Sequence, residues 1–221
     1  MDDTYLVEIR LARTKWRVKN QVSAIAGHYH LEDHMERHPH VTIYGPLTLK
    51  PGIAEDRLIT LLGEIAGRHD PLPFLIGPLE KREGMHGSVI AYSVQPSGAL
   101  VALVRTVAHA LLPITESMNA WDTQPEKKWF HVTVANRLSK EIATRAYDDL
   151  TNNVSRAVVT RHTGIIACIT TWIHSVLHNP GPGPGLLDDT GLRLTVMKGQ
   201  DILAEYDFLQ KTWIRSDHDH K

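Results

Sequence analysis

The sequence predicts one mixed α/β domain of the α+β class, built from two similar lobes that each carry a mainly antiparallel sheet and helices. Three observations support this prediction. The tripeptide pattern His-x-Thr occurs twice, at His40 and His131, each time within a strand-like run and 91 residues apart. Strand and helix patterns alternate along the chain, and each motif strand is followed by a helical segment. The segment 191–214 has the pattern of a terminal hairpin.

The first half of the sequence alternates between strand and helix patterns. Apolar and polar residues alternate in the predicted strands, whereas apolar residues recur at helical spacing in the predicted helices. Glu55 and Asp56 fall in the first turn of one helix, where the helix dipole favours negative charge. The predicted elements are a strand at 4–12, a helix at 17–29, the first motif strand at 40–49, a helix at 54–69, and strands at 72–82 and 87–95.

The second half repeats the order of motif strand and helix. A helix over 97–114 begins with Ser97 as its N-cap, and another over 139–153 begins with Ser139. The stretch 157–178 is apolar and rich in β-branched residues, and its pattern fits either a strand or a helix. The remaining predictions are the second motif strand at 129–138, a loop in NPGPGPG at 179–185, and the terminal hairpin at 191–214 with its turn at 199–200.

Each motif strand presents a histidine and a threonine on one face. Side chains at positions i and i+2 of a strand point to the same side and lie roughly 7 Å apart. His40 therefore has Thr42 as its neighbour, and His131 has Thr133. If the two lobes face each other across a central cleft, two imidazoles and two hydroxyls surround one point.

This set of side chains suits phosphodiester chemistry without a metal. An imidazole with an unperturbed pKa of about 6.5 can accept or donate a proton near neutrality. One histidine would deprotonate the attacking water or hydroxyl and the other would protonate the leaving oxygen, each contributing about 10² to 10⁴ in rate. The threonine hydroxyls would donate hydrogen bonds to the non-bridging phosphate oxygens.

The motif segments HPHVTIYGP and FHVTVAN resemble the two signature motifs of the 2H phosphoesterase superfamily. The resemblance is to its RNA 2′,3′-cyclic phosphodiesterases and 2′-5′ RNA ligases in particular. It extends to the opening YLVEIRLARTK and to the closing LRLTVMKGQDILAEYDFLQKTWI, which is similar to the terminal hairpin of archaeal members. The resemblance implies a bilobal 2H phosphoesterase-like fold with a central cleft, and metal-independent cleavage of a cyclic phosphate without a cofactor.

The resemblance also implies which residues carry the reaction. The catalytic set is His40, Thr42, His131 and Thr133. It makes His40 the general acid and His131 the general base in hydrolysis, whereas the residues by themselves leave these two roles unassigned. We expect the substrate to be an RNA end with a 2′,3′-cyclic phosphate or a small cyclic nucleotide, opened to a 2′-phosphate. Microscopic reversibility allows 2′-5′ RNA ligation on the same groups.

Strand parity adds Tyr44 and Arg137 as candidate substrate-binding residues. Tyr44 falls on the face of His40, where its ring could stack on a base, or else it is a core aromatic on a bent strand. Trp129 precedes His131 with the same parity, and Arg137 follows six residues after it. Family members often carry an arginine directly after the second motif strand, whereas here Asn136 comes before Arg137.

A run of histidines supports a different function. Five of the fourteen histidines lie within thirteen residues, with His-x-His and i, i+4 spacings that suit a metal ion: His28, His30, His34, His38 and His40. The alternative prediction is therefore a metal-dependent hydrolase or a metal-binding module, although this leaves His131 unexplained. A third possibility is a non-catalytic protein that binds RNA ends.

Composition limits the partners of the chain. A formal net charge of −1 argues against a protein that coats nucleic acid, but it is compatible with holding one nucleotide or one RNA end. The basic segment 13–19, which includes Trp16, either contacts longer RNA or is a solvated loop and helix start. No stretch resembles a signal peptide or a membrane span, so we expect a cytoplasmic monomer in which Cys168 is a small core residue.

Overall fold

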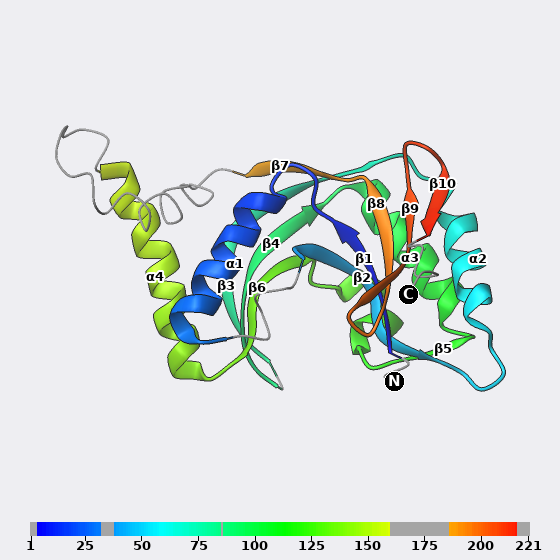
Figure 1. Cartoon of the computed structure of the whole chain (residues 1–221), viewed down its shortest axis with the longest axis horizontal. Coiled ribbons are helices and arrows are strands. Elements are labelled where there is room, and N and C mark those ends of the chain that lie inside the picture. The colour runs from blue at the N-terminus through cyan, green and yellow to red at the C-terminus, as the bar shows by residue number, and fades with distance from the viewer. Residues whose placement is uncertain (1–3, 32–37, 85, 160–185, 216–221) are drawn as a thin grey trace, which may run out of the picture.

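The strands that the structure describes pair into one curled sheet (Figure 1). The computed structural model describes residues 4–31, 38–84, 86–159 and 186–215, and within them ten strands pair, all antiparallel. Their order is β10-β9-β8-β1-β2-β6-β4-β3-β7, and β5 pairs with β2. The strands are β1 (Tyr5–Arg10), β2 (His40–Leu49), β3 (Leu72–Gly84), β4 (Gly87–Pro96), β5 (Thr115–Ser117), β6 (His131–Leu138), β7 (Leu187–Gly191), β8 (Arg193–Lys198), β9 (Asp201–Asp207) and β10 (Thr212–Arg215).

Helices pack against both halves of this sheet. In Figure 1, α1 and α4 lie beside β3, β4 and β6, whereas α2 and α3 lie at the other side of the molecule, near β9 and β2. The helices are α1 (Lys15–Tyr29), α2 (Glu55–Ala66), α3 (Gly98–Leu111) and α4 (Lys140–Val159), with short 3-10 turns η2 (Ala120–Thr123) and η3 (Pro125–Lys127). No helix in the described part of the chain is both long and apolar enough to span a membrane.

The predicted α+β class and antiparallel pairing are confirmed, but the two halves of the sheet are joined. β2 and β6, the two motif strands, pair at Val41 and Val132 and so connect the strands of one lobe to those of the other. β3 and β4 precede the second motif in the sequence, yet they pair with β6 rather than with the first motif strand. The lobes are therefore not successive halves of the sequence.

The local predictions agree with the structure within a few residues. The hydroxyl of Ser97 accepts a hydrogen bond from the backbone N–H of Leu100 at 3.2 Å, and that of Ser139 accepts from Ile142 at 3.2 Å, so both predicted N-caps are confirmed. β5 and β7 were not predicted, because short strands rich in polar residues become strands only through distant partners. Most of 157–178, the loop 179–185, Cys168 and His34 lie outside the described residues.

A buried carboxylate fastens β7 to the start of α1. Asp189, which is 2% exposed, accepts hydrogen bonds from the backbone N–H groups of Ala12, Arg13 and Thr14 at 2.9–3.0 Å, and from the hydroxyl of Thr14. Thr14 is the N-cap of α1 but its side chain makes no capping bond to the helix. The distant Asp189 therefore satisfies donors that the sequence near the helix cannot satisfy.

Replacing this carboxylate should destabilise the fold. We expect Asp189→Ala to lower the free energy of unfolding by about 3 kcal/mol, because several buried donors lose a charged acceptor. Asp189→Asn should cost less, since one carbonyl oxygen remains. Urea denaturation followed by circular dichroism measures both. Asp188→Ala is the matched control, because Asp188 is an exposed neighbour on β7, and equal losses at the two positions would contradict this role for Asp189.

Candidate active site

The two His-x-Thr motifs lie side by side on neighbouring antiparallel strands. Val41 of β2 is paired with Val132 of β6, and both side chains are fully buried in the core. Side chains alternate along a strand, so the residues on either side of each valine point to the opposite face of the sheet. Those residues are His40, Thr42, His131 and Thr133, and all four are partly exposed. Pairing of the motif strands thus gathers the four predicted catalytic side chains on one face.

Both imidazoles are held in the same way. The Nδ1 atom of His40 lies 2.8 Å from the backbone carbonyl of His38, and Nδ1 of His131 lies 2.9 Å from the carbonyl of Trp129. A carbonyl oxygen only accepts, so each Nδ1 carries the hydrogen and donates it to the residue two positions earlier. This fixes the tautomer and leaves Nε2 of each ring available for proton transfer.

His40 has a buried carboxylate beside it. Oε2 of Glu8, on β1, lies 3.2 Å from Nδ1 of His40, and the Glu8 side chain is only 4% exposed. Its other oxygen accepts a hydrogen bond from Nε of Arg10 at 3.1 Å, and Arg10 also lies 3.6 Å from a carboxylate oxygen of Glu205 on β9. The ring of His40 is therefore oriented by a negative group that is itself held in a charged network.

His131 has an aromatic and cationic environment instead. The indole of Trp129 stacks on its imidazole, with ring centres 4.0 Å apart and an angle of 16° between the planes. The guanidinium of Arg82 lies 3.9 Å from the centre of the same indole. The imidazole of His131 and the guanidinium of Arg82 would overlap if both lay on the same face of the indole at these distances. They therefore occupy opposite faces of Trp129. The result is a stack in the order Arg82, Trp129 and His131.

This environment favours the neutral form of His131. Burial lowers the pKa of His131, and the positive charges of His40, Lys128 and Arg82 lower it further, while the hydrogen bond to the Trp129 carbonyl opposes the shift. The ammonium of Lys128 is itself buried and paired with Asp122 at 3.2 Å. A neutral imidazole with a free Nε2 is what a general base requires.

The threonine hydroxyls are available for a ligand. Thr42 is paired with Glu8 on β1, and Thr133 with Ala91 on β4. Neither hydroxyl has a hydrogen-bond partner among the residues that the structure describes. Each can therefore donate to an oxygen atom placed between the two histidines.

Tyr44 does not share the face of the motif residues, and the parity prediction is wrong here. β2 carries a bulge, because Glu8 is paired with Thr42 whereas Val7 is paired with Tyr44, which leaves Ile43 as an extra residue. The ring of Tyr44 is fully buried, and its hydroxyl lies 3.1 Å from that of Thr115. A buried ring cannot stack on a base, so Tyr44 belongs to the core, as the alternative of a bent strand foresaw.

Arg137 lies at the far end of β6. Six residues along a strand correspond to about 20 Å, which is too far for Arg137 to contact a phosphate held by His131. The register of β6 against β4 shifts twice between these positions, and Arg137 adopts a positive φ of 56°. Its side chain is exposed. The structure therefore does not bring Arg137 to the two histidines.

The histidine run is not gathered into a cluster in the described residues. His28 lies in the last turn of α1, His30 follows the helix in a left-handed conformation, His38 precedes β2, and His40 begins it. Among residues 4–31, 38–84, 86–159 and 186–215, no three histidine, cysteine, aspartate or glutamate side chains are arranged to hold a metal ion. His34 lies outside these ranges.

The sequence did not identify Glu8 or Arg82 as site residues. For Trp129 it predicted only that the side chain points to the same face as His131. Glu8 and Arg10 occupy alternate positions of a strand, which is a signal for a polar face, but the identity of the neighbouring strand is a long-range property. The same holds for Arg82, which reaches Trp129 from β3, two strands away from β6.

Comparison with known proteins places the chain in a family. The family model described as the 2′-5′ RNA ligase superfamily matches residues 14–163. No curated protein matched the sequence. Two solved structures of Usb1 from Kluyveromyces marxianus, one with uridine monophosphate, have TM-scores of 0.38, identities of 13% and 14%, and coverages of 91% and 90% of this chain and 96% and 95% of their own.

The match to the family model spans more than half of the sequence. The chain belongs to the 2′-5′ RNA ligase superfamily and is an enzyme of the 2H phosphoesterase type.

Proposed function

We propose that the protein is a metal-independent phosphodiesterase that opens a 2′,3′-cyclic phosphate, at the end of an RNA or on a small cyclic nucleotide, to a 2′-phosphate. One observation carries this proposal. Two imidazoles, each with its Nδ1–H fixed on a backbone carbonyl, lie on paired strands beside two threonine hydroxyls that have no hydrogen-bond partner in the described part of the chain. The family match to 2′-5′ RNA ligases supports an RNA substrate.

The reaction needs one proton acceptor and one proton donor. Nε2 of His131 takes a proton from a water molecule as the water oxygen bonds to phosphorus. The bond from phosphorus to the 3′ oxygen breaks, and that oxygen takes a proton from Nε2 of His40. The products are a 2′-phosphate and a 3′-hydroxyl, and the proton now on His131 returns to solvent as His40 is reprotonated. Thr42 and Thr133 donate hydrogen bonds to the non-bridging oxygens.

The surroundings of the two histidines support this assignment of roles. His131 is kept neutral by burial and by nearby positive charges, which suits a base. His40 has the carboxylate of Glu8 against Nδ1, which supplies a negative counter-charge to the protonated ring that a donor needs. With a 5′-hydroxyl in place of the water molecule, the same groups could open the ring to a 2′-5′ phosphodiester and a 3′-hydroxyl, which corresponds to 2′-5′ ligation of RNA.

Removal of either histidine should abolish turnover in the absence of metal. We expect His40→Gln and His131→Gln to lower kcat by at least about 10², because each loses one proton transfer. The measurement is hydrolysis of a 2′,3′-cyclic nucleotide in excess EDTA. His109→Gln on α3 is the matched control, since that histidine is exposed and outside the motifs.

Two other outcomes would overturn the proposal. Turnover that is absent in EDTA and recovers with zinc or manganese would point to metal-dependent hydrolysis and to the histidine run. Undiminished binding of a cyclic-ended RNA without any turnover by the wild-type protein would indicate a protein that only binds RNA ends.

The lowered pKa of His131 fixes the acidic side of the pH profile. Protonated His131 cannot act as the base, so kcat/KM rises with pH through the pKa of the pair, and its lower midpoint should fall below pH 6.5. A reaction that needs one proton acceptor and one proton donor gives a bell-shaped profile, whose two limbs belong to the coupled pair of histidines. Arg82→Gln should move the lower midpoint upward by less than about one pH unit, because one positive charge is removed. A wild-type midpoint above pH 6.5 would exclude His131 as the base.

Glu8 should affect the rate more than the binding of substrate. Glu8→Gln keeps an acceptor for Nδ1 of His40 but removes the charge, and we expect kcat to fall about tenfold with KM little changed. Glu8→Asp should recover part of this loss. Nitrogen NMR of the His40 ring reports whether Nδ1 still carries the hydrogen, and a loss of kcat with unchanged tautomer and unchanged folding is the expected signature. An unaltered kcat would show that Glu8 serves the fold alone.

A further inference from the structure

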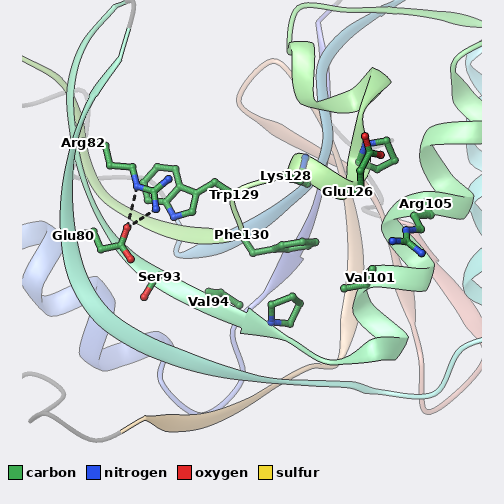
Figure 2. A pocket seen from close by; sticks show the side chains of 12 residues that line it. Glu80, Arg82, Ser93, Val94, Val101, Arg105, Glu126, Lys128, Trp129 and Phe130 are labelled. Carbon is green, nitrogen blue, oxygen red and sulfur yellow. Dashed lines mark hydrogen bonds and ion pairs between the residues drawn. The ribbon is translucent and has the colours of Figure 1, made fainter.

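A groove of about 350 Å³ adjoins the candidate active site at Trp129 (Figure 2). We call it the side groove. It lies between β3, β4, the segment just before β6, η3 and α3. The residues that line it are Glu80, Arg82, Ser93, Val94, Pro96, Val101, Arg105, Pro125, Glu126, Lys128, Trp129 and Phe130. Its volume lies in the range of sites for small ligands, and the proposed reaction does not use it.

The side groove is continuous with the surroundings of His131. Ser93 is paired with His131 on the neighbouring strand, and Trp129 stacks on the imidazole at 4.0 Å. Ser93 and Trp129 both line the groove. A ligand whose phosphate lies at the histidines can therefore extend across Trp129 into the groove without leaving the protein surface.

One end of the side groove offers a flat surface for a base. The guanidinium of Arg82 covers one face of Trp129, and Glu80 holds it there through contacts of 2.7 and 2.9 Å, drawn as dashed lines in Figure 2. The Arg82 side chain is still 49% exposed, so its other face is open. Bases of single-stranded RNA stack on guanidinium planes as well as on aromatic rings. A base placed there would continue the stack from His131.

The other end of the side groove carries an uncompensated positive charge. Arg105 of α3 is exposed and has no ion pair or hydrogen bond to any residue that the structure describes. Val94, Val101 and Phe130 form an apolar surface between the two ends, as Figure 2 shows. Glu126, at the rim, can accept a hydrogen bond from a base amino group. Cations that flank apolar and planar surfaces are typical of grooves that follow single-stranded nucleic acid.

We propose that the side groove binds the nucleotide that precedes the cyclic end of an RNA, with its base on Arg82 and a backbone phosphate near Arg105. The inference rests on the proposed function. It implies that the preferred substrate of the protein is an oligonucleotide. The terminal nucleoside is not the occupant, because Trp129 and Arg82 lie between His131 and the rest of the groove. A cyclic mononucleotide would leave the groove empty.

The test compares the binding of long and short products. The two probes are an RNA trinucleotide that ends in a 2′-phosphate and the corresponding nucleoside 2′-phosphate, titrated against wild type, Arg105→Ala and the control Arg57→Ala. Arg57 is an exposed arginine on α2 that does not line the groove. We expect Arg105→Ala to weaken trinucleotide binding about tenfold at low salt. It should also reduce the slope of log Kd against log salt by about 0.7, the value for one phosphate contact on a single strand.

Binding of the nucleoside 2′-phosphate should be the same in all three proteins. Equal losses for both probes in Arg105→Ala, or no loss for either, would overturn the inference. Turnover of the cyclic mononucleotide, measured alongside, separates this result from the proposed function. Turnover without a selective loss contradicts the groove alone, whereas a selective loss without turnover supports the groove and contradicts the reaction.

Discussion

The pairing of β2 with β6 is the contact on which the site depends. Val41 and Val132 face each other from the two strands, and both are buried in the core, so the register is fixed from the apolar side of the sheet. The polar side chains of both motifs then necessarily occupy the other face. A slip of one residue would turn the histidines into the core, at the cost of burying imidazoles and exposing valines. The same contact that joins the two lobes therefore aligns the two halves of the chemistry.

The two motifs are repeated, but their surroundings are not. Each imidazole donates from Nδ1 to the carbonyl two residues earlier, which is a property of the motif strand itself. What differs is the strand farther out in the sheet, which is β1 beside the first motif strand and β3 beyond β4 from the second. β1 brings the carboxylate of Glu8 to His40, whereas β3 brings Arg82 to the indole that stacks on His131. In the proposed reaction, a repeated tripeptide would thus supply both a proton donor and a proton acceptor, because charge of opposite sign comes from non-repeated strands.

The sequence was sufficient for what depends on local pattern. The alternation of apolar and polar residues and the N-cap residues predicted the helices and most strands. The repeated His-x-Thr motif singled out His40 and His131, whose strands are paired in the structure. It failed where a single extra residue changes the outcome, since the bulge at Ile43 turns Tyr44 into the core. It also missed Glu8, because the choice of β1 as the neighbour of β2 is made by contacts across the whole chain.

The order of strands gives the site a direction. Across the sheet from β1 to β3 the face carries Glu8, then His40, then His131, and finally Arg82. Neighbouring strands are about 4.8 Å apart, so these charges act on one another and on any bound phosphate. Arg10 on β1 pairs with Glu8, and Glu80 on β3 pairs with Arg82, so each outer charge also has a partner of opposite sign on its own strand. In the proposed reaction, the carboxylate beside His40 and the cations beside His131 would thus distinguish the proton donor from the proton acceptor.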